Sequence, residues 1–419
     1  MGDQVGAPLP SRTGWGSRRR RSTTTRNAPR PGALRARHWR PAALVAALAL
    51  VTLQSLGTTA ATPAQASSVP TLSCGAKVAH RRLAYHAVDY WRDRLWRLYA
   101  DSGKGWSGGD GGASVSLPGG RVAWLFNDSY VGKVVDGGRP RPEFVHNLIV
   151  LQHGPQLTTL HGGSRSHPVP FMTYKLSHHN WYWSNSGVET GGVLYVSYSS
   201  YWYPGTPSVY GFVRTGTVLA GFSLRTFHLI SFRWLDNRRH IVWGVSMRRG
   251  ADWVYVYGLR TSGSGSSMTR QVFLARAPVG HMLGPWQYYT GSGWAGTLSL
   301  AAPILGSVSS TFSVNLVDGV YVLTTMSPAF GSEAEMYFGC HPAGPFRNRL
   351  AVWNTSSTGG IYGTMGIKGA YTYGAILQPQ LTRGALTVLS YDVNTSDWSL
   401  IDQNAGIVRP RYVLVRLAF

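Results

Sequence analysis

The chain has 419 residues and a formal net charge of +23 at pH 7, but only two cysteines. Two cysteines provide no zinc-binding spacing, so a cysteine-based zinc site is excluded. Dense clusters of Lys and Arg occur only near the N-terminus, and nucleic-acid binding is therefore not expected of the rest of the chain.

The first 66 residues are predicted to be a signal peptide with a long basic leader. Residues 1–41 carry ten arginines and one acid, and an apolar run follows over residues 42–50. Ala64 and Ala66 then give the small-residue pattern of a cleavage site. A membrane anchor is the alternative, but the run is shorter than the roughly 20 apolar residues that a spanning helix needs. We expect a secreted, extracellular or cell-wall-associated protein with no stable membrane insertion.

Removal of this leader leaves a net charge of +14 on residues 67–419. A basic chain favours anionic surroundings such as a cell wall or acidic glycans. The same charge would also keep a protein soluble without any partner.

Cys74 and Cys340 are the two cysteines, and both lie after the leader. In an exported protein an isolated pair is most simply one disulfide, with free thiols as the alternative. Shortly after Cys74, residues 78–99 carry apolar side chains at three- and four-residue steps. This spacing predicts one amphipathic helix.

Five hairpin turns recur at a near-constant interval after residue 105. Each places glycine between two runs rich in β-branched and aromatic residues. The turns are Gly119-Gly120, Gly191-Gly192, Arg249-Gly250, Asp318-Gly319 and Arg383-Gly384. Their second members are 72, 58, 69 and 65 residues apart, which leaves room for two further strands after each hairpin. Repeats of this length predict four-stranded blades.

The sequence therefore predicts an all-β fold, a five-bladed β-propeller with a short N-terminal helical segment. We divide the chain into the leader (1–66), the helical segment (67–104) and the propeller (105–419). A β-sandwich is the competing architecture, but it does not require five similar units. The final strand, 412–419, is expected to close the ring by pairing with the first blade, because closure removes exposed strand edges.

Acidic residues predicted to gather at one rim of the propeller are the candidates for catalysis. In a hairpin that turns at Gly120, Asp110 and Asp128 return to the same end. The start of each first strand, the end of each second strand and the start of each third strand share this rim. The candidates are Asp110, Asp128, Glu143, Glu333 and Asp392.

Two or three carboxyls around an aromatic mouth are what glycoside hydrolysis needs. One protonated carboxyl acts as the acid, and one ionised carboxylate acts as base or nucleophile. We expect Asp110 to be the base or nucleophile, and Glu333, Asp392 or Glu143 to be the acid. The alternative is that Asp110 and Asp128 cap backbone amides of the glycine-rich loop, which for Asp128 is the favoured interpretation.

Aromatic residues predicted at the same rim are candidates for sugar binding, because the apolar faces of sugar rings pack on aromatic side chains. They are Trp181, Trp183, Trp243, Tyr371 and Tyr373. Inner strands of propellers are also aromatic for packing reasons, so at most half of these side chains should be exposed. His146 falls near the same rim.

Other kinds of site have no support in the sequence. No His, Asp or Glu spacing is diagnostic of a metal, and no Gly-x-Ser-x-Gly elbow is present. The glycine-rich stretch 108–112 enters a strand and not a helix, so it is not a nucleotide loop. We expect a monomer that needs no cofactor, and the sequence leaves open a structural calcium ion in the central channel.

Short motifs follow one another in order along the predicted propeller. They are Gly108-Gly109-Asp110-Gly111, Trp124–Ser129, His146-Asn147, Trp243-Gly244, Tyr255–Gly258, Leu274–Pro278, Gly344-Pro345-Phe346, Tyr373-Gly374-Ala375 and Ser390-Tyr391. In this order they resemble a group of secreted actinobacterial proteins long labelled as domains of unknown function. Members of that group are five-bladed propellers similar to the arabinanase and sialidase-like superfamilies, and some are endo-acting D-arabinanases. The resemblance implies a carbohydrate-active protein in which Asp110 matches the early aspartate and His146-Asn147 lie near the substrate.

The chain also departs from the pattern of that group. Asn127 stands where Phe-Gly-Asp would have its glycine, and Gln378 and Gln380 replace a histidine and a glutamate. Trp183 is followed by Ser-Asn-Ser without the acid often found there. Two hypotheses therefore remain: a glycoside hydrolase acting on a cell-wall or environmental polysaccharide such as an arabinan, and a non-catalytic carbohydrate- or wall-binding propeller.

Overall fold

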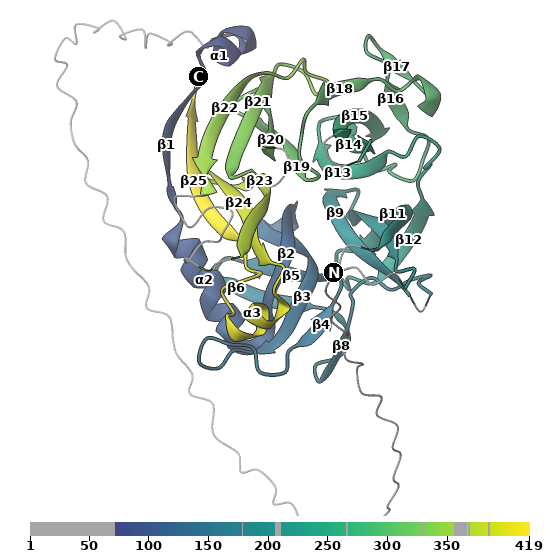
Figure 1. Ribbon diagram of the computed structural model, residues 1–419. Helices are drawn as coiled ribbons and strands as arrows, with labels where there is room; N and C mark the ends of the chain where they lie inside the picture. The colour runs from purple at the N-terminus through teal and green to yellow at the C-terminus, as the bar shows by residue number, and fades with distance from the viewer. Residues whose placement is uncertain are drawn as a thin grey trace, which may run out of the picture. The chain divides into compact units, whose positions relative to one another are not determined.

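A computed structural model of the chain is shown in Figure 1. The structure describes residues 72–419 except 178, 206–210, 265–266, 328–330, 356–366, 368 and 384–385. The predicted signal peptide lies outside the described residues. No helix in the described part of the chain is long and apolar enough to cross a membrane.

The described residues form the predicted five-bladed β-propeller, in which consecutive antiparallel strands build each blade outward from the centre (Figure 1). Blade one contains β2 (Ser102–Leu117), β3 (Arg121–Lys133), β5 (Leu148–His153) and β6 (Gln156–Leu160), with β4 (Glu143–Val145) paired to β3. Blade two contains β9 (Asn180–Thr190), β10 (Val193–Trp202), β11 (Val213–Ser223) and β12 (Leu229–Trp234). A separate small hairpin joins β7 (Gly162–Ser164) to β8 (His167–Val169).

Blade three is the most elaborate sheet, with β13 (Val242–Arg249), β14 (Trp253–Ser262), β15 (Thr269–Pro278), β16 (Gln287–Tyr289), β17 (Trp294–Ala295) and β18 (Pro303–Gly306). Blade four contains β19 (Phe312–Val317), β20 (Val320–Met326), β21 (Glu333–Gly339) and β22 (Arg347–Asn354). Blade five contains β23 (Ala370–Arg383), β24 (Leu386–Thr395), β25 (Arg411–Ala418) and β1 (Arg82–Val88). The helices are α1 (Cys74–His80), α2 (Tyr90–Asp101) and α3 (Trp398–Gln403), with short 3-10 turns at Pro118–Gly120 and Leu298–Leu300.

The predicted hairpin turns separate the first and second strands of every blade. Gly119 and Gly120 lie in the turn between β2 and β3 at φ values of 73° and 71°, a conformation that glycine adopts without a steric penalty. In blade five the turn residues 384–385 lie outside the described part of the chain, but Arg383 and Leu386 pair across it. Apolar side chains between adjacent blades form the core; Val115 and Leu125, for example, pack with Leu194 of blade two.

The single helix predicted over residues 78–99 is wrong, because strand β1 interrupts it. Residues 82–88 pair with β25 and cover its outer edge. The second helix begins at Tyr90, and the Asp89 carboxylate caps it by accepting the Arg92 N–H at 3.0 Å. Leu83 and Ala87 fit a helical period, but pairing with an otherwise open strand edge outweighs that local preference.

The predicted mode of ring closure is also wrong. The C-terminal strand β25 does not pair with blade one; it lies between β24 and β1. The N-terminal strand β1 therefore completes blade five, with register running from Arg82↔Ala418 to Val88↔Val413.

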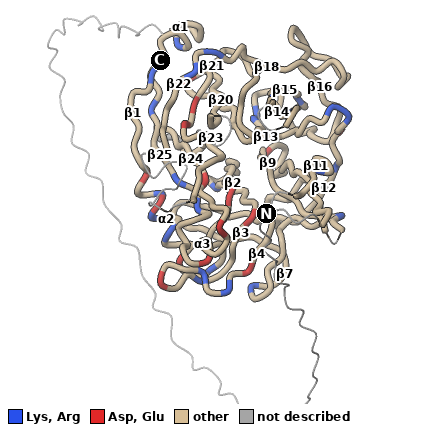
Figure 2. Tube along the Cα trace, in the orientation of Figure 1, with Lys and Arg blue, Asp and Glu red and all other residues tan. Residues whose placement is uncertain are grey.

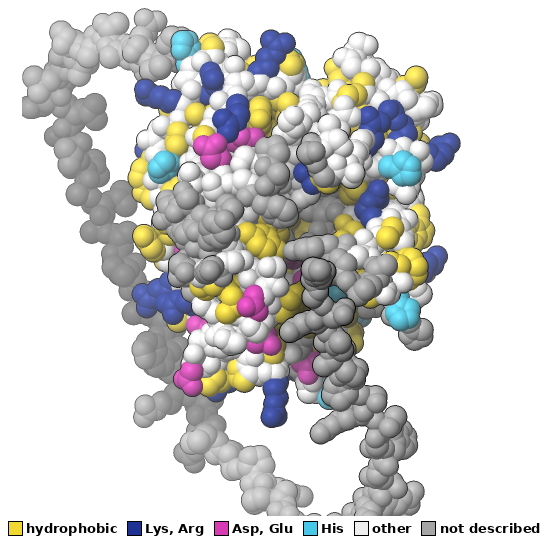
Figure 3. Space-filling view, in the orientation of Figure 1, with side chains coloured by type: hydrophobic (Ala, Val, Ile, Leu, Met, Phe, Trp, Pro, Cys, Tyr) yellow, Lys and Arg dark blue, Asp and Glu magenta, His cyan; other side chains and the backbone are white. Residues whose placement is uncertain are grey.

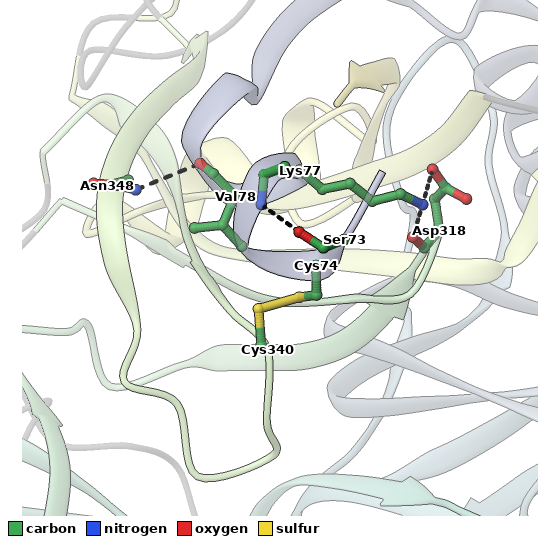
Figure 4. Close-up of a disulfide and its surroundings, with 8 residues drawn as sticks. Ser73, Cys74, Lys77, Val78, Asp318, Cys340 and Asn348 are labelled. Carbon is green, nitrogen blue, oxygen red and sulfur yellow. Dashed lines mark hydrogen bonds and ion pairs between the residues drawn. A yellow bond between two sulfur atoms is a disulfide. The ribbon is translucent and has the colours of Figure 1, made fainter. Parts of the chain in front are cut away.

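The predicted disulfide joins Cys74, at the start of α1, to Cys340, directly after β21 (Figure 4). Beside it, Lys77 Nζ lies 2.9 Å from the Asp318 carboxylate. These contacts attach α1 to blade four, next to the strand that closes blade five.

Replacing both cysteines by alanine is expected to destabilise the fold. The bond closes a loop across 266 residues of sequence, and in the loop-entropy model such a link contributes on the order of 5 kcal/mol. Urea unfolding of Cys74→Ala/Cys340→Ala should show a much lower midpoint. Reduced wild-type protein should match the double variant, and unchanged midpoints would show that the disulfide does not stabilise the native ring.

Candidate active site

A central cavity of about 470 Å³ is lined by residues of the innermost strand of every blade. Those strands are β2, β9, β13, β19 and β23. Its lining combines apolar side chains with uncharged polar ones, and Ser114, Asn185, Ser246, Asn315 and Gln378 are among the polar members. Asp110 and Arg214 bring charge to it.

Asp110 reaches the cavity because strand β2 is irregular at this point. The register with β3 shifts on both sides of Gly111, and Gly111 and Gly112 have φ values of 93° and 60°. Asp110 Oδ2 accepts a hydrogen bond of 2.6 Å from the Tyr373 hydroxyl. Its Oδ1 is buried and makes no hydrogen bond of normal geometry with the described residues. The Asp110 carboxyl is thus held by blade five at the edge of blade one.

Asp392 of β24 lies directly behind this loop and is 3% exposed. Its Oδ2 accepts the backbone N–H of Gly111 at 3.0 Å. The chain passes close to it at Gly374, where a Cβ would lie 2.9 Å from Asp392 Oδ2 and φ is 71°. Glycine is therefore required at 374 for this carboxyl to approach the Asp110 loop.

The three aspartates are coupled electrostatically. Burial raises the pKa of Asp110 to about 7, and the nearby charge of Asp128 adds to the rise. Burial, followed by the charge of Asp110, also raises the pKa of Asp392 well above its usual range. A low local dielectric and like charges both disfavour the ionised form. At neutral pH the structure therefore holds at least one proton in this cluster.

Asp128 of β3 differs from the other two in its surroundings. Its Oδ1 accepts the Trp183 indole N–H at 2.7 Å and lies 2.8 Å from His146 Nδ1. Its side chain is 27% exposed. Among the described residues, these hydrogen bonds run to side chains and none to the glycine-rich loop, so the capping role favoured from the sequence is not what the structure shows.

Aromatic side chains surround Asp128. Trp181 and Trp183 are two residues apart on β9 and point to the same face, as alternate strand residues do. Trp183 lines the cavity, and Trp181 stacks on the His146 imidazole with ring centroids 5.0 Å apart. Tyr201 lies against both indoles. His146 thus bridges the Asp128 carboxylate and the aromatic cluster.

Of the five predicted acids, only Asp110 is among the described residues that line the cavity; Asp128 and Asp392 lie near Asp110, whereas Glu333 and Glu143 lie apart from it. Glu333 of β21 lies 2.6 Å from Arg349 Nη2 on the outer strand β22 and is 40% exposed. Arg349 also bonds Glu335. Glu143 is exposed on β4. Neither Glu333 nor Glu143 lines the cavity.

The predicted sugar-binding residues divide in the same way. Tyr373 lines the cavity, and Tyr371 lies beside it with ring centroids 5.7 Å apart. Trp243 is 1% exposed and packs in blade three against Trp286 and Tyr288. The preceding residue of β13, Val242, lines the cavity, and Trp243 therefore points to the opposite face of the strand.

Asn147 is buried, and its side-chain amide is hydrogen-bonded to backbone groups. Its Nδ2 donates to the carbonyls of Met172 and Tyr182, at 3.2 and 3.0 Å, and its Oδ1 accepts the Met172 N–H at 2.7 Å. These bonds fasten the segment before blade two to β9. Asn147 therefore has a structural role, in contrast to its neighbour His146, whose side chain is 36% exposed.

The residues that the sequence reasoning missed are mostly amides. Gln378 accepts from the Ser114 N–H at 3.2 Å and donates to the Gly112 carbonyl at 2.9 Å, which links blades five and one. Asn127 Oδ1 accepts the Ser184 N–H at 2.7 Å, which links blades one and two. Arg214, near the start of β11, also reaches the cavity. Arg214 lies at the start of the third strand of blade two, a position that the sequence pattern assigns to the same rim as Asp110.

Groups of three or more His, Cys, Asp or Glu side chains that could hold a metal ion are absent from the described residues.

Replacing Asp110 should flatten the dependence of stability on pH. The folded state keeps a proton on Asp110 up to a pKa of about 7, whereas the ordinary value is 3.8. Between these values the native state binds more protons than the unfolded state, so stability falls as pH rises from about 4 through 7. The urea midpoint of Asp110→Asn should therefore fall less over this range than that of wild type. Glu143→Gln is the exposed control and should keep the wild-type slope; parallel wild-type and Asp110→Asn curves would contradict the raised pKa.

Replacing Asn147 should lower stability. Asn147→Ala leaves buried backbone groups of Met172 and Tyr182 without partners, at a cost of at least about 2 kcal/mol in chemical unfolding. Asn185→Ala is the matched comparison, because its partners are side-chain hydroxyls: Ser197 keeps its bond to the Trp243 carbonyl, and Ser199 lines the cavity. Equal losses of stability in the two variants would contradict the structural role of the hydrogen bonds that Asn147 makes to the backbone.

Comparisons with known proteins bear on the fold and the family. Residues 93–417 match the sequence model of a family described as "Domain of unknown function (DUF5005)", and no curated protein matches significantly. A candidate hydrolase from Bacteroides ovatus ATCC 8483 has a similar structure, with 21% identity and a TM-score of 0.65 over 79% of this chain and 90% of that chain. This likeness supports the fold. A thermostable family-43 glycoside hydrolase is 12% identical, with a TM-score of 0.40 over 74% of this chain and 89% of its own. Because the family match covers well over half of the sequence, the chain belongs to the DUF5005 family.

Proposed function

We propose that this protein is a glycoside hydrolase whose catalytic carboxyls are Asp110 and Asp128. The observation that carries the proposal is the different environment of two neighbouring carboxyls. Asp110 is partly buried, and burial together with the nearby charge of Asp128 raises its pKa to about 7. Pairs of carboxyls whose environments separate their protonation states are the basis of acid–base glycoside hydrolysis.

Asp110 is the general acid in this proposal. A carboxyl that is substantially protonated near neutral pH can donate a proton to the glycosidic oxygen as the bond to the sugar breaks. The Tyr373 hydroxyl orients it at 2.6 Å, and Asn394 Nδ2 holds that hydroxyl at 3.2 Å. The role differs from the base or nucleophile expected from the sequence, because burial beside Asp128 and Asp392 favours the protonated form.

Asp128 is the ionised partner. The Trp183 indole can only donate, so Asp128 Oδ1 is set up as an acceptor. As a carboxylate it either activates a water molecule or attacks the anomeric carbon. His146 contacts the same oxygen and fixes the carboxylate against the aromatic cluster.

The cavity is suited to a saccharide. Hydroxyl-rich ligands need many donors and acceptors together with an apolar surface for the ring faces. Serine, asparagine and glutamine side chains supply the first, and Trp183, Tyr201 and Tyr373 supply the second. The sequence motifs resemble those of a group in which some members are D-arabinanases, so an arabinan of a cell wall is the first polymer to test.

Location and state belong to the same proposal. A disulfide between Cys74 and Cys340 is typical of an oxidising compartment, which supports export by the predicted leader. We propose a secreted monomer that needs no cofactor for hydrolysis.

The proposal is tested by reducing-end release from arabinans, galactans and actinobacterial wall polysaccharide. Asp110→Asn and Asp128→Asn should each lower the rate by about 100-fold or more, because each removes a group needed for proton transfer or charge stabilisation. Glu333→Gln is the matched control and should retain activity, since Glu333 pairs with Arg349 away from the cavity.

Full activity of Asp110→Asn would contradict the proposed acid. Absence of release from every polymer, with wild type and Asp110→Asn both retained on one of them, would favour the non-catalytic carbohydrate-binding propeller.

A further inference from the structure

A second pocket, of about 350 Å³, lies between α2 and the segment that leads into β25, and it shares no lining residue with the central cavity. Four arginines line it, with one aspartate, Asp93: Arg94, Arg97, Arg409 and Arg411. We propose that this pocket, here called the arginine pocket, binds the carboxylate or phosphate groups of an anionic polysaccharide.

The two deeper arginines are held in place by the protein. Arg409 Nη2 lies 2.8 Å from Asp101, and its Nε donates to the Ser107 carbonyl. Arg411 donates to the Gly406 carbonyl at 2.9 Å. These bonds fix the guanidinium groups, so that the positive charge at the bottom of the pocket is organised before any ligand arrives.

The two outer arginines are available to a ligand. Arg94 and Arg97 are exposed on α2, and within the described part of the chain neither forms a hydrogen bond or an ion pair. Arginine presents a planar fork of donors that matches carboxylate and phosphate oxygens. Figure 2 shows that acidic residues also occur along α2. The two aspartates of this helix, Asp93 and Asp101, are outnumbered by the four arginines of the pocket.

The arginines also repel one another. Burial, followed by the charge of Arg409, lowers the pKa of Arg139 to about 9. Arg139 donates to the carbonyls of Ser107 and Ala405, next to the pocket. Positive charges gathered in this way are unfavourable on their own, and a bound anion would offset the repulsion.

Aromatic residues indicate that the anion is carried by a sugar. Tyr90 is 76% exposed at the edge of the pocket, where its ring can pack on the face of a sugar. Trp96 and Trp106 form the floor, with ring centroids 5.1 Å apart. A nucleic acid would need an extended basic tract. On the face seen in Figure 3, however, Lys and Arg side chains are spread over the propeller, and the concentration at this pocket is local.

Binding at the arginine pocket does not depend on the proposed hydrolysis. Because the pocket and the central cavity have no residue in common, a charged polymer can be held at one while a neutral segment enters the other. The avidity gained from two linked contacts would retain the protein on an anionic wall.

The test is calorimetric titration of the full chain with polygalacturonate, phosphorylated dextran and unmodified dextran. Wild type should bind one or both anionic polymers and not dextran; which of the two it prefers identifies carboxylate or phosphate as the ligand group. Arg94→Ala/Arg97→Ala should weaken that binding at least tenfold, and Tyr90→Ala several-fold. All changed side chains are exposed, so thermal midpoints should stay at the wild-type value.

Arg225→Ala/Arg347→Ala is the matched control, because both arginines are exposed on other blades. The basic leader is present in every protein compared, so its contribution cancels. Equal weakening by the two double variants would overturn the proposal in favour of general surface charge. So would tighter binding of duplex DNA that Arg94→Ala/Arg97→Ala abolishes, or wild-type affinity for anionic polymers no greater than for dextran. Asp110→Asn should lose hydrolysis and keep anion binding, which separates the two proposals.

Discussion

Ring closure by β1 is the constraint on which the rest of the structure depends. The strand from Arg82 to Val88 pairs along β25, so that the first and last strands of the described chain both lie in blade five. β1 gives blade five its fourth strand, and from β1 the chain continues through α2 into blade one. Tyr373 and Asp392 of blade five can then contact the Asp110 loop of blade one. The candidate site is therefore built at the seam of the ring.

The seam brings together carboxyls that weaken the fold. Asp110 is partly buried beside the buried Asp392, and each contributes to the cost of ionising its neighbours. The described contacts of these two carboxyls are a tyrosine hydroxyl and backbone amide groups, with no Lys or Arg to neutralise them. Gly111 and Gly374 provide the close approach at positive φ. Such an arrangement is a poor device for stability and a suitable one for holding a proton at neutral pH.

The sequence was sufficient to predict the blades, because glycine-containing turns recur at a regular interval and strand alternation follows from local pattern. The same rule placed Asp110, Asp128 and Asp392 at one rim. It failed for Glu333, whose partner Arg349 comes from the neighbouring outer strand. It also failed for Trp243, because Val242 takes the cavity-facing position and Trp243 alternates to the other face. Cross-strand partners and bulges depend on tertiary packing, which a single sequence does not reveal.

The amide side chains that depart from the family pattern form structural hydrogen bonds that a carboxylate could not form. Gln378 both accepts from Ser114 and donates to Gly112, across the seam between blades five and one. A carboxylate accepts but cannot donate, and it would add another like charge beside Asp110. Because the amide leaves three coupled aspartates in place, its presence is no argument against hydrolysis. It instead confines the ionisable chemistry to the Asp110 and Asp128 side of the cavity, where the aromatic residues lie.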